Sequence, residues 1–140
     1  MFQKITGIMI VVSGLFAGTP AGHAQEPDTL KSIISNQIEA FRNNDGVTAF
    51  GFASLRLRSI FQSPERFMEM VKRQYGPVYR PENFSFGQTS LETAGQPIQV
   101  VDIVDQQGRS WRAFYTFEQH PDGSWRIASV QLEKLPGSSV

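Results

Sequence analysis

The 140-residue chain contains no cysteine. Disulfides, thiolate metal sites, a cysteine nucleophile and a lipoprotein anchor are therefore excluded, and the fold must rest on packing alone. Histidine is almost as scarce, with only His23 and His120. His120 falls in a predicted tight turn without oriented partners, which favours a solvated turn residue over a base or ligand. Zinc chemistry and a Ser-His-Asp triad are disfavoured, and we expect no metal and no cofactor.

Neither sign of charge is in excess, because 13 Lys and Arg face 13 Asp and Glu. Removal of a leader containing Lys4 would leave 12 basic against 13 acidic residues. A net charge so close to zero gives no electrostatic reason to bind nucleic acid or an anionic membrane.

The chain also lacks an apolar run of the roughly 20 residues that a membrane span needs. The shorter run Ile5–Phe16 follows Lys4 and precedes the small-x-small sequence Gly22-His23-Ala24. This order is typical of a signal peptide. We therefore predict a leader at residues 1–24, a single domain at 25–134 and a flexible tail at 135–140. The protein would be exported to the periplasm or secreted, with no membrane association after cleavage.

Apolar residues at three- and four-residue steps predict a helix over Leu30–Arg42. Two further helices are expected at about 47–53 and 63–75, the latter beginning at Ser63-Pro64 and stopped by Gly76-Pro77. Residues 55–61 suit either a short strand or an irregular turn, and 77–81 suit an extended crossing segment.

Four strands follow at hairpin spacing, at about 84–93, 98–104, 110–119 and 125–133. Turn chemistry in the last two connections sets a register in which Asp102 faces Arg112, Phe117 faces Ile127 and Tyr115 faces Ser129. The aromatic-rich face should meet the helices. The predicted fold is α+β, with three N-terminal helices on a curved four-stranded antiparallel meander, cone-shaped and cystatin-like.

Four stretches carry a resemblance to known proteins: Gln37–Phe41, Ala49–Ser54, Phe61–Pro81 and Asp122–Ile127. With them the chain is similar to a bacterial family of exported proteins, domain of unknown function 4864. Its order of elements resembles the nuclear transport factor two-like (cystatin-like) superfamily. The family has no established activity, so the resemblance assigns no catalytic residue. The superfamily implies a cone-shaped pocket, frequent dimers, and functions from isomerases and dehydratases to binding modules.

The predicted helix-facing side carries polar groups that could orient a ligand among aromatic walls, and two tyrosines could border the mouth of the cone. These candidate pocket residues are Tyr115, Ser129, Gln131, Gln99, Trp111, Tyr75 and Tyr79. The same groups could instead be core residues satisfied by backbone or water.

Carboxylates read as helix caps, turn residues or partners of arginine, and none clearly points into the cone. We therefore expect a non-catalytic domain that binds a small apolar or amphipathic ligand, or a protein partner. An isomerase or dehydratase would need an inward carboxylate beside Tyr115. A dimeric scaffold without ligand would need a filled interior.

The sheet face away from the helices is unexpectedly apolar in this register. Contiguous apolar surface of this kind indicates an interaction site, and a two-fold arrangement would let the patch cover its twin. We therefore predict a homodimer through the sheet, with Val100, Phe114, Val130 and Leu132 at the contact.

Overall fold

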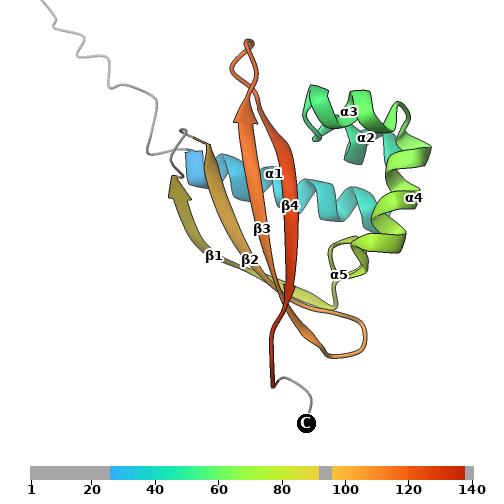
Figure 1. Cartoon of the computed structure of the whole chain (residues 1–140), viewed down its shortest axis with the longest axis vertical. Coiled ribbons are helices and arrows are strands. Elements are labelled where there is room, and N and C mark those ends of the chain that lie inside the picture. Colours follow the sequence, from blue (N-terminus) through green and yellow to red (C-terminus); the bar gives the residue numbers. More distant parts are fainter. Residues whose placement is uncertain (1–25, 92–95, 138–140) are drawn as a thin grey trace, which may run out of the picture.

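The computed structural model describes residues 26–91 and 96–137. The helices are α1 (Glu26–Arg42), α2 (Gly46–Gly51), α3 (Leu55–Phe61), α4 (Pro64–Gln74) and α5 (Gly76–Tyr79). The strands are β1 (Asn83–Leu91), β2 (Pro97–Val104), β3 (Ser110–Gln119) and β4 (Trp125–Lys134). Figure 1 shows α1 lying across one face of the sheet, with α3, α4 and α5 beside β4. The fold is therefore α+β as predicted, while the predicted leader lies outside the described residues.

The helical half contains five helices among the described residues, where the sequence predicted three. Residues 55–61 form α3, capped by Ser54, whose Oγ accepts from the Leu57 amide at 3.3 Å. The same chemistry starts α4, where Ser63 Oγ accepts from the Arg66 amide at 3.2 Å. The predicted extended segment after Gly76 is wrong in its first part, because α5 begins there. Pro77 cannot continue α4, because proline lacks the backbone N–H that a helix interior needs. Proline is tolerated in the first turn of a helix, so the same residue suits the start of α5.

The sheet is an antiparallel meander in the order β1-β2-β3-β4, as predicted. Asp102 pairs with Arg112 and Phe117 pairs with Ile127, which confirms those registers. Arg112 Nε donates to Asp102 Oδ1 at 2.9 Å. The hairpin turns therefore have the predicted alignment.

A bulge in β4 overturns the predicted register beyond Ile127. Thr116 pairs with Ser129, so Ala128 is an extra residue on β4. Tyr115 consequently faces Val130 rather than Ser129. An inserted residue swaps the faces of all that follows, so Val130 and Leu132 pack against the core.

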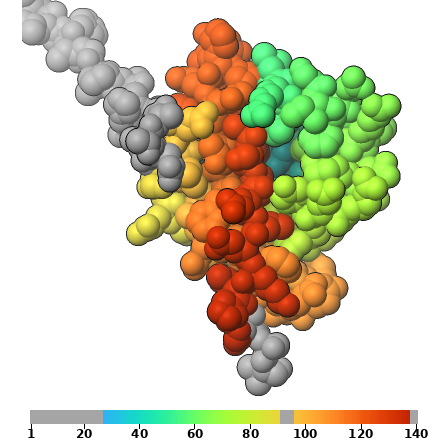
Figure 2. Space-filling view, viewed as in Figure 1, coloured from blue at the N-terminus to red at the C-terminus, as the bar shows by residue number. Residues whose placement is uncertain are grey.

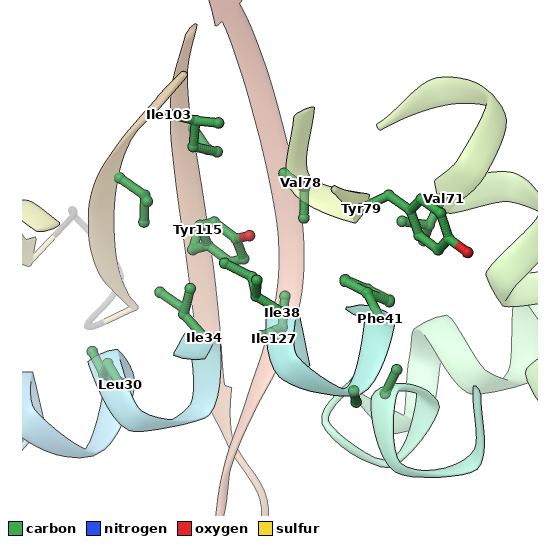
Figure 3. Packing of buried hydrophobic residues seen from close by; sticks show 14 of the residues in the cluster. Leu30, Ile34, Ile38, Phe41, Val71, Val78, Tyr79, Ile103, Tyr115 and Ile127 are labelled. Atoms are coloured by element: carbon green, nitrogen blue, oxygen red, sulfur yellow. The ribbon is translucent and has the colours of Figure 1, made fainter. Parts of the chain in front are cut away.

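The core lies between α1 and the sheet (Figure 3). Leu30, Ile34, Ile38 and Phe41 form the buried stripe of α1, as their spacing predicted. Their partners across the interface are the buried strand residues Val101, Ile103, Ala113, Tyr115, Phe117 and Ile127. No helix among the described residues has the length and hydrophobicity of a membrane span.

Candidate functional site: an apolar cleft beside β4

An apolar cleft of about 330 Å³ lies between β4 and helices α3, α4 and α5. In Figure 2 it is a hollow between the red β4 and the green helices, with blue-green α1 visible at its bottom. Its lining residues are Gln37, Phe41, Ala53, Leu57, Phe61, Phe67, Met70, Val71, Gln74, Tyr75, Val78, Ile127, Ala128, Ser129 and Val130. The volume falls in the range of small-molecule sites.

Helical spacing and the β-bulge together bring these residues to the cleft. Leu57 and Phe61 are four residues apart and share one face of α3. On α4, Phe67, Met70 and Val71 follow the three- and four-residue steps of one helical face. The bulge at Ala128 turns the Val130 side chain toward the same side. The β4 side of the cleft therefore depends on Val130, whose side chain would lie on the other face of the sheet if β4 had no bulge.

None of the described residues that line the cleft carries a charged side chain. Its polar side chains are amides and hydroxyls, and Gln37 Nε2 is already occupied by the Ala49 carbonyl at 3.1 Å. The described residues also contain no cluster of His, Asp and Glu that could hold a metal ion. A surface of this kind favours an uncharged, apolar ligand over a charged one.

The comparison with protein families connects this architecture to relatives. A model described as Domain of unknown function (DUF4864) matches residues 23–140. The chain belongs to this family. Comparisons with curated proteins and with solved structures gave no match.

Tyr115 of this DUF4864 protein is fully buried on β3. Its hydroxyl has no hydrogen-bond partner among the described residues, and in Figure 3 it points toward Val78. Burial raises the pKa of this hydroxyl well above its ordinary value, so it stays protonated. Tyr115 does not line the cleft.

Three other predicted pocket residues have structural partners. Gln99 Nε2 donates to the carbonyls of Gly87 and Val100, at 3.0 and 2.8 Å, and so holds the bulge of β1. Trp111 Nε1 donates to Asp105 Oδ2 at 2.9 Å. The Tyr79 hydroxyl donates to Asn44 Oδ1 at 3.0 Å. None of the three lines the cleft.

Tyr75 and Ser129 do line the cleft. The bulge places the Ser129 and Gln131 side chains on the sheet face away from the helices, where both are exposed. The predicted helix-facing position of these two residues is therefore wrong. Alternate side chains leave opposite faces of a strand, so the Ser129 side chain lies on the other face from that of Val130.

Two titratable side chains, His120 and Asp105, are largely buried outside the cleft. His120 is not solvated as expected, because its side chain is only 10% exposed and Nε2 lies 3.5 Å from Glu118 Oε1. Asp105 is the one buried carboxylate among the described residues. Burial alone would raise the pKa of Asp105, but hydrogen bonds from Trp111, Arg109 and Gln107 outweigh it and lower the pKa to about 2. Asp105 is thus fully engaged in its own turn.

The sequence did not identify the helix residues of the cleft as site residues, because their apolar character is equally typical of a filled core. Phe67, Met70 and Val71 show the helical spacing of a buried stripe, whereas Leu57 and Phe61 lie in a stretch that suited a strand or a turn. Spacing alone cannot tell a filled interior from an open one. For the bulge a signal did exist. Apolar residues occupy odd positions up to Ile127 and even positions from Val130, which is the change of phase that an inserted residue produces.

Proposed function

We propose that this protein is a non-catalytic binding domain whose cleft beside β4 holds an uncharged guest that is apolar or amphipathic, either a small molecule or a segment of a protein partner. The observation that carries the proposal is an uncharged, largely apolar cleft of about 330 Å³ with a visible mouth. Burying apolar surface of the guest there contributes roughly 25 cal/mol per Å². An open cleft supports a binding role over a scaffold with a filled interior.

The cleft chemistry favours binding over an isomerase or dehydratase. Such an enzyme needs a carboxylate near the Tyr115 hydroxyl. Asp105, the one buried carboxylate in the part of the chain that the structure describes, accepts hydrogen bonds from Trp111 and Arg109 instead. No Asp or Glu lines the cleft.

Export is part of the proposal. Lys4, the apolar run Ile5–Phe16 and the small-x-small site ending at Ala24 support a cleaved leader and a periplasmic or secreted protein. Intact mass of the protein from a periplasmic extract tests this. The expected mature chain starts at Gln25, and a chain still starting at Met1 would refute cleavage.

A homodimer through the outer sheet face is a second part of the proposal. Val100 pairs with Phe114 on that face, and both are half-buried beside the ion pair of Asp102 and Arg112. Val130 and Leu132 no longer support the contact, because they pack on the helix side. The remaining apolar patch is smaller than the sequence suggested.

A fluorescence titration with N-phenyl-1-naphthylamine tests the binding role. The dye is uncharged and brightens in apolar surroundings. The substitution Leu57→Trp places a larger side chain into the cleft, and we expect it to weaken dye binding by at least about tenfold.

The matched control is Leu55→Trp on the same helix. Leu55 is 56% exposed and does not line the cleft, so this variant should bind the dye like the parent. Circular dichroism of both variants checks the fold. Absent dye binding by the parent, or equal weakening by the two substitutions, would reject the cleft as the site.

A further inference from the structure

The outer edge of β4 is open beside the cleft. β4 is the last strand of the sheet and pairs with β3 alone. On its other side, Ile127 exchanges two backbone hydrogen bonds with Phe52 and Ser54, both at 2.9 Å. Beyond Ile127, no backbone partner of this outer edge is found among the described residues. Such an edge is a template for another strand.

The alternation of backbone groups identifies which amides are open. Ile127 directs its N–H and C=O outward, and the extra residue Ala128 moves the next outward position to Val130. From the other end, the Leu135 amide donates to Ser110 on β3 at 2.9 Å, so the inward positions are odd-numbered there. Counting forward from Ile127 and backward from Leu135 therefore gives the same result: the backbone N–H and C=O groups of Val130 and Leu132 point toward the open edge.

These open groups adjoin the apolar cleft, since Ala128, Ser129 and Val130 form its β4 wall. A purely apolar guest would remove backbone groups from water without supplying partners for them, which is costly. A guest that carries its own backbone donors and acceptors would satisfy them. The cleft therefore suits a polypeptide better than a hydrocarbon.

Resting on the proposed function, we propose that the guest is an extended peptide segment of a partner protein, added to β4 as a fifth strand. Its backbone pairs with Val130 and Leu132. Its alternate side chains, uncharged and apolar, enter the cleft toward Leu57, Phe61 and Met70.

Continuity with an existing contact supports this occupant. Ala53 already bridges Ile127 in parallel, as the first residue of such a fifth strand would. The chain then leaves the edge, because Ser54 caps α3. The partner segment would continue the pairing along β4 from the point where residues 52–54 stop. An uncharged lining matches an uncharged segment.

The small volume of the cleft argues against a second folded copy at this place. Helices α3 and α4 stand across from the edge, and the space between is about 330 Å³. One extended segment occupies a width near 5 Å, the spacing of neighbouring strands. The edge of another complete sheet, with its own helices, would meet α3 and α4.

Amide NMR of the full mature chain tests the proposal with a short blocked peptide of alternating threonine and valine. We expect the amide resonances of Val130 and Leu132 to shift and their hydrogen exchange to slow. The inward amides of Ser129 and Gln131 should change little. The same peptide with every backbone nitrogen methylated keeps its side chains but lacks donors, and should bind at least about tenfold more weakly.

Leu132→Pro provides a second comparison. It removes an outward N–H for which no partner is found among the described residues, and Leu132 does not line the cleft. We expect it to lose peptide binding and keep N-phenyl-1-naphthylamine binding. If this variant fails to fold, the methylated peptide on the parent chain decides alone.

The contrary outcomes separate the two proposals. Equal binding of both peptides, or dye binding without any peptide binding, would overturn the fifth strand and leave the apolar cleft standing. Failure of dye and peptide together would overturn both. Slowed exchange at Val130 and Leu132 that grows with protein concentration, without peptide, would identify a second copy as the occupant and also overturn the proposal.

Discussion

Phe41 belongs both to the packed core and to the lining of the cleft. Its ring lies 6.2 Å from that of Phe67 and 5.9 Å from that of Tyr79, centroid to centroid, and it also lines the cleft. Aromatic pairs at such distances add to the effect of burial. The residue therefore supports both stability and the shape of the site.

We predict that Phe41→Ala lowers the free energy of unfolding by about 3–5 kcal/mol. The reason is the loss of a fully buried ring and the enlarged cavity left behind. Urea denaturation measures the change. Val47→Ala is the control, because Val47 is 73% exposed and should cost under about 0.5 kcal/mol. An unchanged midpoint for Phe41→Ala would show that the ring is not part of the core.

Asp105 gives stability a defined dependence on pH. Its folded pKa of about 2 lies below the ordinary 3.8, so its stabilising effect is present above about pH 4 and is lost as pH falls toward 2. Asp105→Asn should cost on the order of 1–2 kcal/mol at pH 7, with the difference from the parent shrinking below pH 4. Denaturation curves at pH 7 and pH 2.5 measure this.

The control for that experiment is Asp102→Asn. Asp102 and Arg112 are each about two-fifths exposed, and exposed ion pairs contribute roughly 0–1 kcal/mol. A loss at Asp105 that stayed constant from pH 7 to pH 2.5 would contradict an ionised, hydrogen-bonded carboxylate there.

Among the elements, β4 and α3 show what the sequence could and could not predict. The strands and their turns followed from alternation and from glycine turn chemistry, and the α1 stripe followed from its period. The bulge broke the register at Ala128 without a glycine to mark it. Residues 55–61 were ambiguous because alternating Leu and Arg fits a strand, whereas the capping hydroxyl of Ser54 decides for a helix.

Deleting Ala128 tests the importance of the bulge. Without the extra residue, Ser129 and Gln131 would turn toward the core and Val130 and Leu132 toward the outer face. We expect a loss of at least about 3 kcal/mol, measured by urea denaturation. Ala128→Ser keeps the residue count and should cost less than about 1 kcal/mol. Equal stability of the deletion and the parent would mean that β4 tolerates either register.

At the scale of the whole molecule, the sequence could not predict where the cleft lies. A list of apolar helix residues fixes which faces are buried but not whether the layers close completely. The gap depends on how α3, α4 and α5 turn at Ser63 and Gly76 relative to β4. The outer sheet face looked more apolar than it is for a different reason, because the bulge at Ala128 moves the Val130 and Leu132 side chains to the helix side.

The assembly state is the next prediction at this scale. The parent protein should sediment as a dimer at tens of micromolar, and Phe114→Asp should shift it toward monomer, because the substitution would bury an unpaired charge at the contact. Arg112→Lys keeps the charge on the same face and serves as the control. A parent that sediments as a monomer would reject the sheet dimer.

The most direct test of the binding cleft uses the two methionines beyond the predicted leader. Met70 lines the cleft, whereas Met68, on the same helix, lies at a different surface beside Lys72 and Tyr79. With carbon-13-labelled methionine methyl groups, NMR follows both positions while N-phenyl-1-naphthylamine is added. We expect the Met70 methyl resonance to shift in proportion to the dye bound while the Met68 resonance stays in place. Saturable dye binding with an unmoved Met70 resonance, or equal shifts at Met68 and Met70, would contradict binding in the cleft.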